Sequence, residues 1–107
     1  TIKRGPGVFE IPVIISKNIA KFNGFIALGC VIKGETPHFD FICNSVFNSI
    51  LNLSINYNKP ITNGIITALN INQAKNRSIK NEKNKSNKGS EAANAIIMIL
   101  KNGPKKI

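Results

Sequence analysis

The sequence predicts a single α/β domain with three layers, in which helices cover both faces of a parallel sheet. Segments with helical periodicity alternate along the chain with short apolar segments. Residues 25–32 are continuously apolar apart from Gly29, which is typical of a parallel strand that is covered on both faces. The 107 residues are enough for one small domain with one core.

The first part of the chain predicts a strand end at residues 2–4, a turn at 5–7 and a helix over 10–22. Glycine and proline in Gly5-Pro6-Gly7 favour the turn. The apolar residues of the helix recur at helical spacing: Ile11, Ile15, Ile19 and Phe22. Asn23-Gly24 would end this helix before the strand at 25–32 begins.

A second helix is expected from Thr36, as its cap, to about Tyr57, with Pro37 at its first position. Its apolar stripe is broad and predicts core packing, with room for a second buried contact such as a neighbouring subunit. The stripe comprises Phe39, Ile42, Val46, Ile50 and Leu53, widened by Cys43 and Phe47.

The remaining chain predicts a short strand over 61–67, interrupted at Asn63-Gly64, and a helix capped by Asn70. The polar and basic segment 75–88 is expected to be a loop or a frayed helix. A last helix follows over 89–101, and residues 102–107 are expected to be a loose tail.

The formal net charge of +10 leaves nucleic-acid binding as an alternative function. Arginine occurs only at positions 4 and 77, however, and the lysines accompany many asparagines and isoleucines. We interpret most of this charge as compositional drift of the codons towards A and T. The basic segment 75–88 also contains no aromatic residue on which bases could stack.

The two cysteines, Cys30 and Cys43, lie in apolar surroundings and have no metal-binding spacing. They predict neither a zinc site nor a disulfide framework, and they favour a reduced, cytoplasmic setting. No apolar run is long enough to span a membrane, so no membrane association is expected.

Ligands of parallel α/β folds bind beyond the carboxyl ends of the strands, which here points to residues 7–10, 30–38 and 63–67. His38, the only histidine, is a candidate general acid–base, although a surface histidine near a helix start is about as common. The amides of Glu35 and Thr36 could cradle a phosphate. The alternative for these two residues is an ordinary glycine turn followed by a helix cap.

A phosphate cradle needs an opposing cation, and Arg77 is the first candidate because guanidinium pairs with phosphate through two hydrogen bonds. Lys88 is the second candidate. Val8-Phe9-Glu10, between a turn and a helix, could recognise a polar ligand. The alternative is that Glu10 only complements the positive end of its helix.

Five stretches of the sequence, in order, resemble the 6,7-dimethyl-8-ribityllumazine synthase family of riboflavin biosynthesis. The most specific is Ala27-Leu28-Gly29-Cys30-Val31-Ile32-Lys33-Gly34-Glu35-Thr36-Pro37-His38-Phe39-Asp40. The others are Pro6-Gly7-Val8-Phe9-Glu10-Ile11-Pro12, Pro60-Ile61-Thr62-Asn63-Gly64-Ile65-Ile66-Thr67, Gln73-Ala74 with Arg77, and Asn87-Lys88-Gly89-Ser90-Glu91-Ala92-Ala93. The resemblance covers almost the whole chain.

The resemblance implies a reaction without metal or organic cofactor. A ribitylamino-pyrimidinedione condenses with 3,4-dihydroxy-2-butanone 4-phosphate, and the products are the lumazine, phosphate and water. His38 would transfer protons, and Glu35, Thr36, Arg77 and Lys88 would bind the phosphate. The pyrimidine and its ribityl chain would contact the remaining matched residues: Val8, Phe9, Glu10, Cys30, Val31, Ile32 and, from the adjacent subunit, Asn63.

The resemblance also implies a flavodoxin-like strand order and a homo-oligomer, either a pentamer or a multiple of it, with possible association with riboflavin synthase. Residues 1–107 would form one domain in which the family's N-terminal strand and helix are missing. The segment between Arg77 and Lys88 is longer than the family's usual link. A catalytically inactive fragment that binds the ligand or builds a shell is therefore an alternative.

Overall fold

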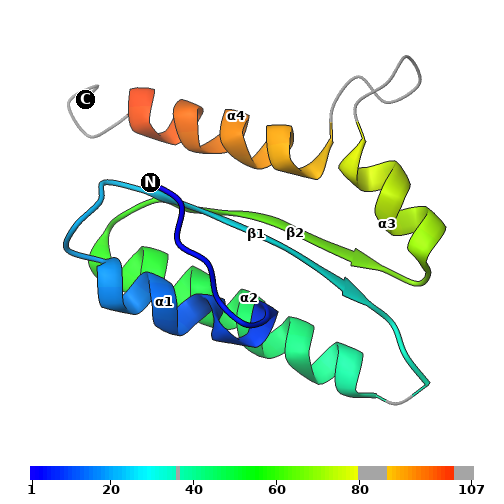
Figure 1. Cartoon of the computed structure of the whole chain (residues 1–107). Helices are drawn as coiled ribbons and strands as arrows, with labels where there is room; N and C mark the ends of the chain where they lie inside the picture. Colours follow the sequence, from blue (N-terminus) through cyan, green and yellow to red (C-terminus); the bar gives the residue numbers. More distant parts are fainter. Residues whose placement is uncertain (36, 80–86, 103–107) are drawn as a thin grey trace.

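The computed structural model describes residues 1–35, 37–79 and 87–102, which form three layers (Figure 1). Helices α1 and α2 lie on one face of a two-stranded sheet, and α3 and α4 lie on the other. This arrangement confirms the predicted three-layer α/β fold. The elements in order are η1 (Val8–Glu10), α1 (Ile11–Asn18), β1 (Phe25–Ile32), α2 (His38–Tyr57), β2 (Ile61–Ala68), α3 (Ile71–Ser78) and α4 (Lys88–Lys101).

The two strands are parallel and in full register, from Phe25 opposite Ile61 to Ile32 opposite Ala68. Backbone hydrogen bonds extend the pairing at both ends, from Phe25 N to Pro60 O (2.9 Å) and from Lys33 N to Ala68 O (2.8 Å). β2 is continuous, so the interruption predicted at Asn63-Gly64 was wrong. Both strands therefore end at the same level, and the loops that follow them leave from one edge of the sheet.

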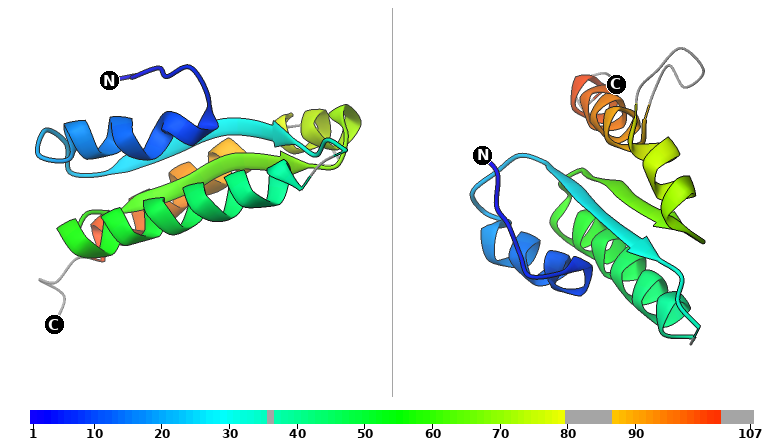
Figure 2. Two further views of the ribbon diagram at one scale, coloured as in Figure 1. Left: turned by 90° about the horizontal axis from the view of Figure 1, so that it is seen from below. Right: turned by 45° about the vertical axis from the view of Figure 1, so that its right-hand side comes forward.

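Residues 2–4 do not form the strand end that the sequence predicts. The sheet of the described chain contains only β1 and β2, and residues 1–6 belong to neither strand. A strand needs a neighbour to receive its backbone hydrogen bonds. Residues 1–4 instead run as an exposed segment past the sheet before the chain enters η1 (Figure 2).

Helix α1 ends at Asn18 and does not reach Phe22 as predicted. The Asn18 side chain donates to Ile14 O (2.8 Å), and the next turns are tighter, with Ile19 N bonded to Ser16 O and Lys21 N to Asn18 O. Such side-chain bonds to the backbone compete with continued helix. Phe22 lies beyond the helix and packs edge-on against Phe25, with ring centroids 5.9 Å apart.

The core lies between the sheet and the layer formed by α1 and α2. Its buried members are Ile15, Ala27, Val46, Ile50 and Ile65, of which Val46 and Ile65 are each only 1% exposed. Because Cys43, Val46 and Ile50 of α2 are buried, the prediction that its stripe packs in the core is confirmed. Within the described ranges, no helix is both long and apolar enough to cross a membrane.

Asparagine side chains begin the two helices on the opposite face. Asn70 accepts a hydrogen bond from Gln73 N (2.9 Å), which confirms it as the cap of α3. Asn87 accepts from Ser90 N (2.8 Å) while Ser90 Oγ accepts from Asn87 N (3.0 Å), a reciprocal cap that starts α4 at Lys88.

Three boundaries differ from the prediction or lie outside the described residues. Pro37 stands at the N-cap of α2 and is not its first helical residue, and the expected cap, Thr36, lies outside the described residues. The predicted loop over 75–88 is helical up to Ser78, and its residues 80–86 are not described. Of the predicted tail, only Asn102 is described, and its backbone N–H bonds to Met98 O.

Candidate active site

The carboxyl edge of the sheet brings three of the predicted segments together. Ile32 and Ala68 end β1 and β2 opposite each other, so the loop before α2 and the loop before α3 leave from adjacent points. η1 packs beside β1 near the same edge. In parallel sheets, this edge is where ligands bind.

His38 is the first residue of α2, and its side chain is exposed. Pro37 precedes it with φ −70°, and its carbonyl accepts from Asp40 N (3.1 Å), which closes the first turn. The imidazole therefore lies at the positive end of a helix of 20 residues. This position gives a proton-transfer group access to a ligand in solvent.

The loop before α2 leaves open space beside its backbone. Apart from its two chain neighbours, no heavy atom of the described residues lies within 4 Å of a Cβ added to Gly34, and no described glycine has a positive φ. The backbone conformation therefore does not require glycine at this position. Glu35 follows in an exposed bend, so its amide is accessible to an anion approaching the loop.

Arg77 is held at the end of β2. It lies in the last turn of α3, and its Nη1 donates to the carbonyl of Thr67, the residue that pairs with Val31. Leu69 N donates to Gln73 Oε1 (2.9 Å), which fixes the start of α3 close to the end of β2. Residue types alone do not indicate these two anchors, because both hydrogen bonds have a backbone group as one partner.

η1 packs against β1 just before the candidate site. A Cβ on Gly29 would lie 2.8 Å from Val8 Cγ2 and 3.6 Å from Ile11 Cδ1, so only glycine permits this close approach. Val8 and Glu10 are half-buried, whereas Phe9 is exposed. The structure thus places Val8, which was predicted to contact a ligand, against Gly29, directly before the predicted segment 30–32.

Side chains of β1 alternate towards the end of the strand. Cys30 and Ile32 are exposed on one face, and Val31 is half-buried on the other. Cys30 is a free thiol at the surface. Cys43 is also free but buried, and burial raises the pKa of its thiol, with a smaller contribution from the carboxylate of Asp40.

Two predicted residues lie away from this cluster in the described chain. Asn63 pairs with Ala27, roughly 16 Å along the strand from Ala68 at about 3.3 Å per residue, and its Oδ1 accepts from Ile65 N (2.8 Å). Lys88 begins α4, next to Gly89, which lies over Leu28 in the middle of β1. The position of Asn63 agrees with the expectation that it serves an adjacent subunit, whereas Lys88 lies away from the other proposed phosphate ligands in the described chain.

The described residues contain no group of three or more histidine, cysteine, aspartate or glutamate side chains that could hold a metal ion. The groups available at the carboxyl edge are an imidazole, a guanidinium, a carboxylate and backbone amides. Together they can bind an anion and move protons.

Comparison with known proteins gives one family. The family model described as 6,7-dimethyl-8-ribityllumazine synthase matches residues 1–102. The chain is 43% identical to the 6,7-dimethyl-8-ribityllumazine synthase of Vesicomyosocius okutanii subsp. Calyptogena okutanii, over 89% of this chain and 59% of the relative. It is 49% identical to the enzyme of the same name from Limosilactobacillus reuteri, over 67% of this chain and 49% of the relative.

A third relative of that name, from Bartonella tribocorum, is 38% identical over 90% of this chain and 66% of its own length. The chain therefore spans between about half and two thirds of the length of these curated relatives. The family match itself extends over nearly all of the present sequence. The chain belongs to the 6,7-dimethyl-8-ribityllumazine synthase family.

Proposed function

We propose that this chain carries the catalytic edge of a lumazine synthase, which acts in the penultimate step of riboflavin biosynthesis. Its substrates would be 5-amino-6-(D-ribitylamino)uracil and 3,4-dihydroxy-2-butanone 4-phosphate. The observation that supports this most is the attachment of Arg77 to the end of β2, level with the strand end that leads to His38. A cation, an open loop backbone and an imidazole at one sheet edge suit a phosphorylated substrate that must lose its phosphate.

The proposed chemistry is condensation assisted by positioning and proton transfer. The amine of the pyrimidine attacks the ketone, water leaves, and an imine forms. Arg77 and the amide of Glu35 would hold the phosphate as it departs, with Lys88 and Thr36 as further candidates. His38 would move protons while the imine rearranges and the second ring closes with loss of water.

The pyrimidine and its ribityl chain would contact residues 8–10 and residues 30–32, and the contact of Val8 with Gly29 places η1 next to the part of β1 that leads to residues 30–32. Val8, Phe9 and Glu10 come from η1, which packs on the face of β1 that carries Gly29 and Val31, whereas the exposed Cys30 and Ile32 are on the other face. We propose that the remaining contact, Asn63, comes from a second subunit, because its own chain holds it far from this edge.

The assembly would then be a homo-oligomer, either a pentamer or a multiple of it, and association with riboflavin synthase is a further prediction. We also propose that the protein works in the cytoplasm. The support for this setting is that both cysteines are free thiols, as is usual in reducing compartments.

The decisive test is His38→Ala, assayed by the absorbance of the lumazine product. We expect kcat to fall about 10²- to 10⁴-fold, as is typical when a general acid–base is removed. The molecular mass of the assembly in solution should equal that of the parent. Unchanged turnover would remove His38 from the mechanism. If the parent chain binds the lumazine but forms none, the alternative of an inactive ligand-binding fragment holds instead.

A further inference from the structure

Helix α3 lies next to the end of β2, and two of its side chains are bonded to the backbone there (Figure 1). Arg77 Nη1 donates to the carbonyl of Thr67, and Gln73 Oε1 accepts from the N–H of Leu69 (2.9 Å). Gln73 and Arg77 are four residues apart, so they lie on the same face of the helix, one turn after the other. One face of α3 is therefore fixed to one short stretch of backbone, residues 67–69.

These two bonds use backbone groups that point away from β1. The carbonyl of Ala68 accepts from Lys33 N, so the backbone of Ala68 faces β1. Adjacent residues of a strand direct their backbone groups to opposite sides, so the Thr67 carbonyl and the Leu69 N–H face outward. In a parallel ladder, one residue of a next strand would donate to that carbonyl and accept from that N–H. Helix α3 supplies the same donor and acceptor from two side chains.

Gln73 is bonded to the loop before α3 through both its backbone and its side chain. Its N–H donates to Asn70 Oδ1 (2.9 Å), while its Oε1 accepts from Leu69 N. Gln73 is half-buried, whereas Arg77 is exposed. A helix of eight residues is marginal by itself in water, so its position depends on such contacts. Loss of the Gln73 acceptor would therefore loosen the helix that carries Arg77.

The bond to Thr67 prepares the guanidinium of Arg77 for an anion. A guanidinium has five N–H donors, so one bond to a carbonyl leaves the others for a ligand. Arginine has a long side chain with many rotamers, and fixing one rotamer before the ligand arrives lowers the entropic cost of binding. The exposed position of Arg77 gives an anion access to the remaining donors.

We propose that Gln73 is a positioning residue for Arg77. Its bond to Leu69 N keeps α3 where the Arg77 guanidinium can contact the Thr67 carbonyl and a phosphate at the same time. Gln73 itself does not touch the phosphate in this proposal. The inference rests on the proposed function, because it takes Arg77 as a ligand of the phosphate.

The test measures the dissociation constant of inorganic phosphate by calorimetry, which requires no turnover. Gln73→Met removes the acceptor and keeps an unbranched side chain that suits a helix. We expect it to weaken phosphate binding by about threefold to tenfold, as for one lost hydrogen bond. Arg77→Ala should weaken binding by about tenfold or more. The double variant should bind like Arg77→Ala, because Gln73 acts only through Arg77.

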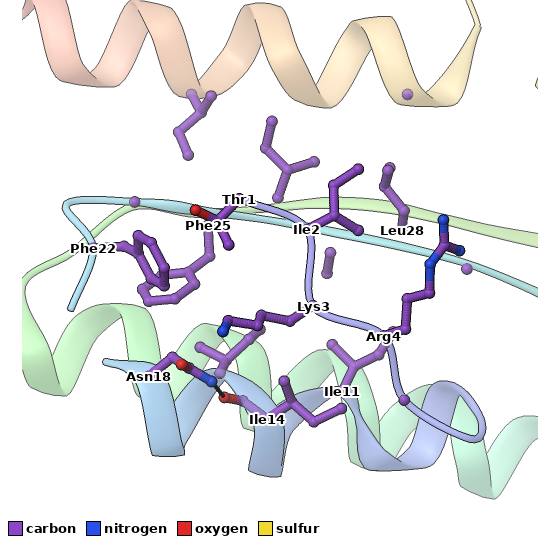
Figure 3. A pocket seen from close by; sticks show the side chains of 18 of the residues that line it. Thr1, Ile2, Lys3, Arg4, Ile11, Ile14, Asn18, Phe22, Phe25 and Leu28 are labelled. Atoms are coloured by element: carbon purple, nitrogen blue, oxygen red, sulfur yellow. Dashed lines mark hydrogen bonds between the residues drawn. The ribbon is translucent and has the colours of Figure 1, made fainter. Parts of the chain in front are cut away.

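Two control variants separate this effect from general ones. Asn72 is exposed on α3 and makes neither of the two bonds, so Asn72→Met should bind phosphate as the parent does. Arg4, the only other arginine, lines the pocket between α1 and α4 (Figure 3). No residue of α3 lines that pocket, so Arg4→Ala removes the same charge elsewhere and should leave phosphate binding unchanged.

The outcomes distinguish this inference from the proposed function. If Gln73→Met binds phosphate as the parent does and Arg77→Ala does not, the positioning role is wrong and the phosphate role of Arg77 stands. A further loss of equal size when Gln73→Met is added to Arg77→Ala would also overturn the positioning role. If Arg77→Ala binds like the parent, if the parent binds no phosphate, or if Arg4→Ala loses as much as Arg77→Ala, both proposals are wrong.

Discussion

At the scale of single residues, Gly34 is a position at which a substitution should change ligand binding without changing the stability of the fold. Beyond its two chain neighbours, an added methyl group would meet no atom of the described residues within 4 Å, and no described glycine has a positive φ. We expect Gly34→Ala to leave the melting temperature nearly unchanged and to raise KM for the butanone phosphate, because a Cβ would obstruct the approach of the phosphate to the backbone. Steady-state kinetics with each substrate in turn would measure this.

Arg77→Ala is the comparison variant for that measurement. It removes the proposed phosphate partner and should raise the same KM by about tenfold or more, since charged hydrogen bonds are worth roughly 1.5–3 kcal/mol. If Gly34→Ala affects only the pyrimidine, or affects neither substrate, the loop does not bind the phosphate. The partner of Arg77 in the free chain is the backbone carbonyl of Thr67, which neither substitution removes.

Which residues could be identified from the sequence depends on how local their signal is. His38, Glu35 and Gly34 follow a strand within a few residues, so strand, turn and helix start suffice to place them together. Arg77 lies far along the chain, and only the fold brings it to the end of β2. The sequence predicts Arg77 as a candidate cation, but its bond to the carbonyl of Thr67 leaves no trace in residue type and could not be predicted.

At the scale of elements, the cap of α4 permits a stability prediction. Asn87 and Ser90 satisfy each other's backbone N–H groups at the start of a helix of 14 residues that buries Ala92 and Ile96. Asn87→Ala should reduce the free energy of unfolding by about 1 kcal/mol, within the usual range for a lost N-cap. Urea denaturation would measure the change.

Asn94→Ala is the matched control, because Asn94 is exposed in the interior of the same helix. Alanine is the better helix former, so this variant should be neutral or slightly stabilising. An equal loss in both variants would mean that the asparagines act through something other than the cap.

Some boundaries of the helices and strands could be predicted from the sequence, and others could not. β1 matched its prediction at both ends, and Asn70 was identified as a cap, because apolar runs and capping residues act within a few positions. The strand predicted at residues 2–4 failed because a strand depends on a neighbour elsewhere in the chain. The end of α1 failed because the Asn18 side chain bonds back to Ile14, which periodicity does not reveal.

At the scale of the whole molecule, α2 presents two different apolar surfaces. The stripe that includes Val46 and Ile50 is used by the chain's own core. Three large apolar side chains of the same helix, Phe41, Leu51 and Ile55, are more than half exposed. The contact with a neighbouring subunit that the sequence suggested would therefore use this second surface, defined by Phe41, Leu51 and Ile55, and not the predicted stripe.

Leu51→Glu tests whether this second surface holds the proposed homo-oligomer together. Leu51 is 58% exposed in the single chain, so the substitution should cost little in folding, whereas a carboxylate buried between subunits would be strongly unfavourable. We expect the mass measured by sedimentation to fall below that of the parent. Val13→Glu, at a 52% exposed position on α1, is the control and should keep the parent mass. If Leu51→Glu and the parent sediment alike, this face of α2 is not an interface, and the contact must be sought on another element.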